Sequence, residues 1–347
     1  MRKLMILLSV ILLLAVPVGA MDFTAPDAPQ SAQKYMPDST DNFADGLLFV
    51  IRSAMKTVQP SLVEASAVCI SLIAASLLVG LMSEVSGNAK NAVVLVGTVT
   101  AGVLLLRPAN SLIRLGTDTV QQISQYGKLL LPVMTGALAA QGATAKSGVL
   151  YAATAFFDAV LSIGVSELLV PLVYIFLCIA IVYNLFPRAL LREMRKFLIW
   201  LVTWGLKTIL YLFTGYITIT GVIAGTTDAT MLKATKLTIS GMVPVVGNIL
   251  SDASEAVLVS AGLMKNAAGI YGLLAVIALW IGPSLQIGIQ YLMLKLTAGI
   301  CEMLGSKQMS ELMKDFSTAM GVVLAMTGTV CVIFLISTIS FMKGVSW

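Results

Sequence analysis

One stretch of the chain, residues 221–262, concentrates the side chains that could do chemistry in this sequence. It lies among apolar segments of membrane-spanning length, yet it holds both acidic and basic residues. Ionisable groups are costly at membrane depth, so they usually face protein or a water-filled cavity. The stretch also contains residues that interrupt helices. The ionisable and helix-breaking residues of this motif segment are Asp228, Lys233, Lys236, Asp252, Glu255, Gly241, Pro244 and Gly247.

Two interpretations of the motif segment remain open. Asp252 and Glu255 have the spacing of a helix-capping box, and Asn248 falls on the same helical face. The first interpretation is a broken helix whose polar face lines a path or contacts a partner subunit. The second is a loop outside the cytoplasm that carries a capped amphipathic helix. Under the first interpretation, the candidate pore or subunit-contact residues are Asp228, Gly241, Pro244, Gly247, Asp252 and Glu255.

Catalytic and metal-binding chemistry finds little support elsewhere in the sequence. The chain has no histidine, which removes Ser-His, Cys-His and His-metal sites. Its four cysteines are far apart and show no CxxC spacing. Residues 142–147 resemble a phosphate-binding loop but fail its spacing. We therefore predict that the protein is not an enzyme and has no cofactor and no metal site.

The composition is that of a membrane protein. Hydrophobic residues make up 58% of the chain and charged residues 11%, against roughly 25% charged residues in ordinary soluble domains. The net charge of +5 comes from short basic clusters beside apolar runs, which suits a membrane surface better than nucleic acid. The predicted fold is all-α, a polytopic membrane helix bundle with broken or re-entrant segments and about seven to nine crossings.

The sequence divides the chain into three parts. Residues 1–20 have a basic start, an apolar run and a small-residue end, which is the layout of a secretory signal peptide. An uncleaved anchor helix is the alternative. Residues 21–60 are predicted to form a short flexible extracytoplasmic arm that leads into an interfacial helix. Residues 61–347 form the multi-span membrane domain.

Within the multi-span domain, apolar runs alternate with short polar joints. Residues 111–128 are polar but have one apolar helical face, so we expect them to lie on the membrane or to cap the bundle. A Gly-Pro pair at residues 282–283 predicts a break between two runs. The expected spans are residues 62–82, 92–106, 129–145, 149–165, 168–186, 197–224, 267–281, 285–300 and 320–342.

The densest basic loop, residues 188–196, predicts the orientation. Short loops rich in Lys and Arg stay in the cytoplasm. With the N-terminal arm outside, an odd number of crossings must precede this loop. Five of the expected runs satisfy that condition, and three would do so if residues 129–165 formed a re-entrant hairpin. The cytoplasmic topology determinants are therefore Arg188, Arg192, Arg195 and Lys196.

The motif segment resembles the stage III sporulation protein AE family of endospore-forming bacteria. The resemblance is carried by GVIAGTTD at residues 221–228 and by TISGMVPVVGNILSDASE at residues 238–255. The signal peptide, the multi-span core and the basic loop fit the same family, so the resemblance covers most of the chain.

The resemblance implies a membrane subunit of a multiprotein, secretion-like channel complex that links the mother cell and the forespore during sporulation. It implies as partners a secretion-type ATPase, ring-forming subunits and other sporulation membrane proteins, and a location in the mother-cell membrane around the forespore. Two alternative functions remain open. One is a stand-alone secondary transporter of a small solute, with a binding site at the broken segments around Pro132 and Pro244. The other is a non-conducting membrane scaffold.

Overall fold

The computed structural model describes residues 25–37, 43–56, 58–140, 144–219 and 267–343. This part of the chain is helical and contains no β-strand, which confirms the predicted all-α class. The elements are α2 (Gln30–Gln33), α3 (Phe43–Met55), α4 (Val58–Val85), the 3-10 turn η1 (Gly87–Ala89), α5 (Lys90–Ala140), α6 (Thr144–Ile163), the π-helical segment η2 (Gly164–Leu169), α7 (Val170–Leu185), α8 (Ala189–Ile219), α11 (Ala267–Met303) and α12 (Lys307–Lys343).

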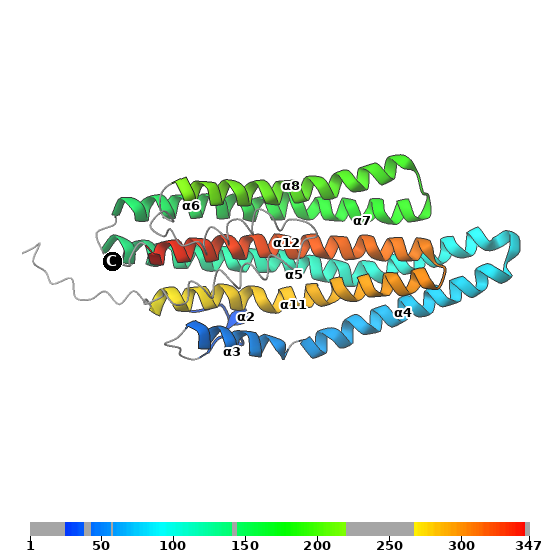
Figure 1. The fold of residues 1–347 in the computed structure, drawn as a ribbon, viewed down its shortest axis with the longest axis horizontal. Coiled ribbons are helices and arrows are strands. Elements are labelled where there is room, and N and C mark those ends of the chain that lie inside the picture. The colour runs from blue at the N-terminus through cyan, green and yellow to red at the C-terminus, as the bar shows by residue number, and fades with distance from the viewer. Residues whose placement is uncertain (1–24, 38–42, 57, 141–143, 220–266, 344–347) are drawn as a thin grey trace, which may run out of the picture.

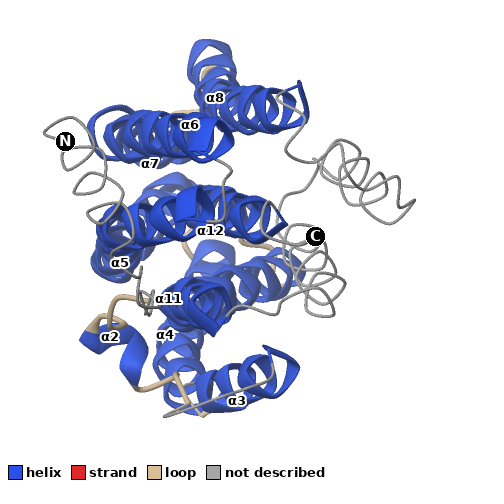
Figure 2. Cartoon of the chain, turned by 90° about the vertical axis from the view of Figure 1, so that its left-hand side faces the viewer, coloured by secondary structure: helices blue, strands red, loops and turns tan. Residues whose placement is uncertain are grey.

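The helices pack side by side in three layers along one long axis (Figure 1). The middle layer consists of α5 and α12. One side is covered by α6, α7 and α8, and the other by α11, α4, α3 and α2, as the end-on view in Figure 2 also shows. Of the candidate membrane spans in the described residues, α12 is the most enclosed, with 83% of its most apolar 18-residue window buried. It is therefore the central helix of the bundle.

The connections between helices gather at the two ends of the bundle. Loops 86–89, 186–188 and 304–306 lie together at one end (Figure 1). We call this the basic end, because Lys90 and Lys307 start helices there and the basic loop follows α7. The far end holds the starts of α3, α6 and α11 and the ends of α8 and α12 (Figure 1).

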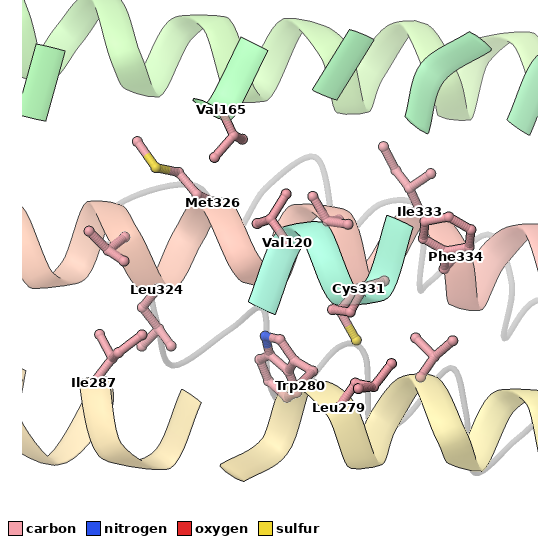
Figure 3. Close-up of a cluster of buried hydrophobic side chains, with 14 of the residues drawn as sticks. Val120, Val165, Leu279, Trp280, Ile287, Leu324, Met326, Cys331, Ile333 and Phe334 are labelled. Atoms are coloured by element: carbon pink, nitrogen blue, oxygen red, sulfur yellow. The ribbon is translucent and has the colours of Figure 1, made fainter. Parts of the chain in front are cut away.

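Apolar side chains from all three layers fill the space around α12. Val120 of α5, Trp280 of α11 and Phe334 of α12 lie in one cluster with Val165 of η2 (Figure 3). A Cβ atom added to Gly127 on α5 would overlap the ring of Phe334. In a bilayer, helix association depends on close van der Waals packing rather than on burial from water. The glycine at position 127 therefore lets α5 and α12 approach closely.

Six helical runs of the described residues are long and apolar enough to cross a membrane. With 51 residues, α5 is ~76 Å long, more than twice the ~30 Å hydrocarbon thickness. The bundle is thus longer than a bilayer core is thick. The six runs cover residues 43–85, 87–138, 147–185, 189–218, 268–303 and 307–342.

Several runs that were expected as separate crossings are continuous helices. The runs at residues 92–106 and 129–140 belong to one helix, α5, and those at 149–165 and 168–185 are joined through η2. The expectation that residues 111–128 lie on the membrane or cap the bundle is wrong, because they form the middle of α5. Their apolar face, which includes the fully buried Val120, packs inside the bundle instead.

The prediction of a helix break at residues 282–283 is also wrong. Pro283 lies inside α11, just as Pro108 and Pro132 lie inside α5. Proline is tolerated inside membrane helices, because neighbouring helices and polar side chains can satisfy the backbone groups that it frees. A proline also explains the π-helical geometry of η2. Pro171 has no N–H to donate to Glu167, four residues earlier, and the chain there adopts a π-helical turn.

The N-terminal arm packs on the bundle in the part that the structure describes. Tyr35 is buried, and its hydroxyl is 2.5 Å from the position a Cβ of Gly282 on α11 would occupy. The hydroxyl of Tyr126 on α5 donates to the carbonyl of Pro26 at 3.3 Å. Residues 25–37 are therefore not a free arm. The amphipathic helix expected after the arm is α3, which places one apolar side, including Val50, against the bundle.

Candidate functional site

The predicted pore or subunit-contact residues all lie in residues 220–266, outside the described part of the chain. Their roles therefore stay predictions. What the structure does describe is the position of the two helices that the segment connects. The end of α8 and the start of α11 both lie at the far end of the bundle, opposite the basic end (Figure 1).

Of the predicted basic loop, only Arg188 lies in the turn between α7 and α8. The prediction of a loop is wrong for residues 189–196, because α8 starts at Ala189 and its first turns hold Arg192, Arg195 and Lys196. α7 ends at Leu185, and Phe186 takes an extended conformation with φ −131° and ψ 83°. The residue before a proline is disfavoured in the helical region, so Pro187 explains this break. The topology determinants Arg188, Arg192 and Lys196 are exposed, whereas the side chain of Arg195 is largely enclosed.

Arg195 turns inward and forms a buried ion pair. Its Nη1 donates to Oδ2 of Asp315 on α12, and the Nδ2 of Asn184 on α7 donates to the same oxygen at 3.1 Å. The guanidinium also lies over the ring of Tyr183, 4.4 Å from its centroid. Buried charges in proteins are paired and hydrogen-bonded, and here one carboxylate joins three helices. Arg195 is therefore a structural connector as well as one of the basic residues at the start of α8.

Sequence reasoning missed Asp315. A signal for it was available, because Asp315 lies in the first turns of the last apolar helix among residues with helical apolar spacing. A carboxylate on the inward face of such a helix needs a partner. The sequence alone could not say which of the basic residues supplies it.

A polar cleft of about 580 Å³ opens between α4, α5 and α11, and we call it the central cleft. Its α5 wall presents charged side chains at helical spacing, so they share one face of the helix. Its α11 wall presents two glutamines. The charges balance, with two arginines and two carboxylates. The charged and amide residues of the cleft are Glu64, Arg107, Asn110, Arg114, Asp118, Gln286 and Gln290.

The central cleft lies beside a missing backbone hydrogen bond within the continuous helix α5. Pro108 lines the cleft and cannot donate a backbone hydrogen bond to the carbonyl of Leu104. Glu64, Arg107 and Asp118 are exposed side chains there. Charged residues inside membrane bundles usually face a water-filled cavity or a protein partner. The cleft can therefore hold water or receive polar groups of another chain.

A second polar group of residues is fully enclosed between α5, α6 and α12. The hydroxyl of Ser124 donates to Oδ2 of Asp158 at 2.7 Å, while Oδ1 of Asp158 has no hydrogen-bond partner. Thr154, one turn earlier on α6, donates to the hydroxyl of Ser337 on α12 at 2.9 Å. Because these side chains are enclosed, they connect helices within the bundle rather than offering a surface to other molecules. Within the described residues, no group of three or more Cys, Asp or Glu side chains could hold a metal ion.

Comparison with known proteins identifies the family. The family model for stage III sporulation protein AE matches residues 37–345, nearly the whole length. The chain belongs to the stage III sporulation protein AE family. This confirms the resemblance seen in residues 221–255. A curated relative, stage III sporulation protein AE of Bacillus subtilis (strain 168), is 22% identical over 235 residues. That match covers 68% of this chain and 59% of the relative, so the chain spans less than two thirds of the relative's length. No solved structure matches the chain.

The family assignment and the six candidate spans of the described residues both indicate a membrane protein. Members of a sporulation family with several apolar helices are expected in a membrane, and the described residues contain six candidate spans. The region matched by the family model contains the central cleft, the Arg195–Asp315 pair and the motif segment.

Proposed function

We propose that the protein is a membrane subunit of a multiprotein channel complex that links the mother cell and the forespore during sporulation. The observation that carries the proposal is the family match over residues 37–345, combined with a bundle of six candidate spans. In this proposal the protein is not an enzyme. A partner ATPase supplies energy, and ring-forming subunits and other sporulation membrane proteins complete the complex.

The distribution of basic residues supports an orientation within this proposal. Lys90, Lys307 and the basic residues 188–196 at the start of α8 all lie at the basic end, which by the positive-inside rule faces the mother-cell cytoplasm. Three helical runs, α3–α4, α5 and α6–α7, precede the basic loop, which is the odd number that the sequence required. The far end then faces the space between the two membranes. The motif segment connects two helices at that end, so it is positioned for contact with subunits in that space.

The central cleft supplies a second contact surface. Its two arginines and two carboxylates lie at mid-length of the bundle, where a surrounding bilayer would disfavour exposed charge. A partner helix with matching polar groups, or water in a path between subunits, would satisfy them. Both a partner helix and a water path between subunits require a second chain beside the cleft, so the cleft favours a subunit of an assembly over an isolated chain.

Affinity purification from sporulating cells tests the proposal. The tagged full-length protein is expected to co-purify with other sporulation membrane proteins. Arg107→Gln/Arg114→Gln is expected to reduce this recovery at least tenfold while the protein still reaches the membrane. Arg52→Gln/Lys56→Gln removes the same charge from exposed sites outside the cleft and serves as the matched control.

The motif segment needs a separate variant. Alanine at Asp228, Asp252 and Glu255 together is expected to weaken complex assembly and forespore gene expression. If assembly and expression stay intact, those three residues have no role in the contact. Purified protein in liposomes distinguishes the alternative function, since coupled solute uptake without partners would establish a stand-alone transporter.

A further inference from the structure

A pocket of about 500 Å³ is built mainly by α8, two turns from its start at the basic end. We call it the α8 pocket. Phe176 of α7 and Asp315 and Thr318 of α12 close its inner side. Its volume lies within the range of about 300–1,000 Å³ that small-ligand sites occupy. The role proposed above does not use this pocket.

The α8 pocket is cationic. Arg195, Lys196 and Lys207 line it, and the one carboxylate among its lining residues, Asp315, is paired with Arg195. Lys196 also contacts the exposed Glu193 at 3.1 Å, beside the pocket. The lining residues together carry an excess of two positive charges. Such a site attracts an anionic group.

Exposed tryptophans lie between the cationic residues. Trp200 and Trp204 are 57% and 53% exposed, and their rings stack with centroids 6.0 Å apart. Phe197 stacks on Trp200 at 5.9 Å on the same helix. Tryptophans of membrane proteins concentrate at the depth of the lipid headgroups, where an amphipathic ring is best accommodated. These rings therefore place the pocket at the membrane interface on the basic side.

The spacing along α8 brings charge and aromatic surface together. Lys196, Trp200 and Lys207 are four and seven residues apart, which puts them on one helical face. The axial distance from Lys196 to Lys207 is ~16 Å. Lysine side chains near the ends of membrane helices extend toward the headgroup layer. Lys196 lies in the second to third turn of α8, whereas Lys207 lies near the middle of the helix. A ligand that contacts both lysines must therefore extend along α8 from the headgroup layer.

We propose that the α8 pocket binds the headgroup of an anionic phospholipid from the leaflet at the basic end. Arg195 and Lys196 bind the phosphate. A guanidinium has five N–H donors, so Arg195 can hold Asp315 and a phosphate oxygen together. Trp200 and Trp204 pack against the glycerol and the upper acyl chain. A zwitterionic headgroup would bring its own cation toward these basic residues, so the pocket prefers a net negative lipid.

Tryptophan quenching by brominated lipids tests the proposal on the full-length protein. A Trp280→Phe/Trp347→Phe background limits the emission to the two tryptophans of α8. In vesicles of matched bromolipid content, phosphatidylglycerol is expected to quench this emission more strongly than phosphatidylcholine, by roughly threefold or more in apparent affinity. Lys196→Gln/Lys207→Gln is expected to bring the ratio close to one. Lys196→Gln alone changes only an exposed side chain and is expected to give an intermediate ratio.

The matched control is Lys90→Gln/Lys307→Gln, which removes two exposed lysines from the same end but outside the pocket. It is expected to keep the preference for phosphatidylglycerol. The proposal is overturned if the pocket variants keep the parent ratio or if the control loses it equally. It is also overturned if millimolar inorganic phosphate abolishes the preference, because the pocket would then take a free phosphate rather than a lipid.

Discussion

Arg195 on α8 and Asp315 on α12 form a buried ion pair although they are 120 residues apart in the chain. Both side chains are largely enclosed, with 15% and 10% of their surfaces exposed. The pair connects the outer layer of the bundle to its central helix at the basic end. The same contact positions the guanidinium at the inner side of the α8 pocket.

Removing one member of this pair is expected to destabilise the bundle. Asp315→Ala leaves the arginine charge enclosed without its partner, which typically lowers the free energy of unfolding by about 3–5 kcal/mol. Thermal or denaturant unfolding in detergent measures the effect. Glu193→Ala, which removes an exposed partner of Arg192 and Lys196, is expected to leave the midpoint unchanged. Equal midpoints for the two variants would contradict a structural role of the buried pair.

The close approach of α5 and α12 predicts an asymmetry between two glycines. Gly127→Ala forces the ring of Phe334 to move and is expected to cost about 1–3 kcal/mol of stability. Gly205→Ala meets no atom within 4 Å and is expected to stabilise α8 by up to about 1 kcal/mol. Melting temperatures in detergent compare them. Adding Phe334→Leu is expected to recover part of the stability lost in Gly127→Ala. If it recovers none, the overlap with the ring of Phe334 is not the cause of the loss.

Because Ser124 on α5 donates to the enclosed carboxylate of Asp158 on α6, we expect substitutions at these two positions to have non-additive effects on the free energy of unfolding. Ser124→Ala removes the hydrogen bond to Oδ2 and is expected to cost about 1–3 kcal/mol. The double variant Ser124→Ala/Asp158→Val removes both polar groups and is expected to be more stable than Ser124→Ala alone. A double-mutant cycle in unfolding experiments gives the coupling, and purely additive effects would rule it out.

Because the loops 86–89, 186–188 and 304–306 lie at the same end of the bundle, we expect cysteines placed near them to be labelled from the same side of the membrane. In a background with Cys178→Ala, which removes the exposed native cysteine, Asn88→Cys and Gln308→Cys lie at the basic end. An impermeant maleimide is expected to label both from the cytoplasmic side of oriented vesicles. Asp45→Cys, at the start of α3 at the far end, is expected to react from the opposite side. Labelling of all three positions from one side would refute the orientation.

Local features of the sequence determined the class of this protein. Apolar content and helical spacing are properties of neighbouring residues, so the all-α membrane bundle and the amphipathic α3 could be predicted. The basic loop and the family motif at residues 221–255 were likewise readable in the chain, and the family match confirmed the latter. The continuity of α5 and α11 was not predicted. Neighbouring helices support a proline inside a helix, and the local sequence does not contain those neighbours.

Tertiary structure alone decided which distant residues meet. Asp315 pairs with Arg195, Ser124 donates to Asp158, and α4 and α5 bring together the charges of the central cleft. Each of these depends on which helix faces which, and that is set by side-chain packing across the whole bundle. The sequence singled out Arg195 as a marker of topology. The fold made it a buried connector, because a partner carboxylate 120 residues away lies on the adjoining face of α12.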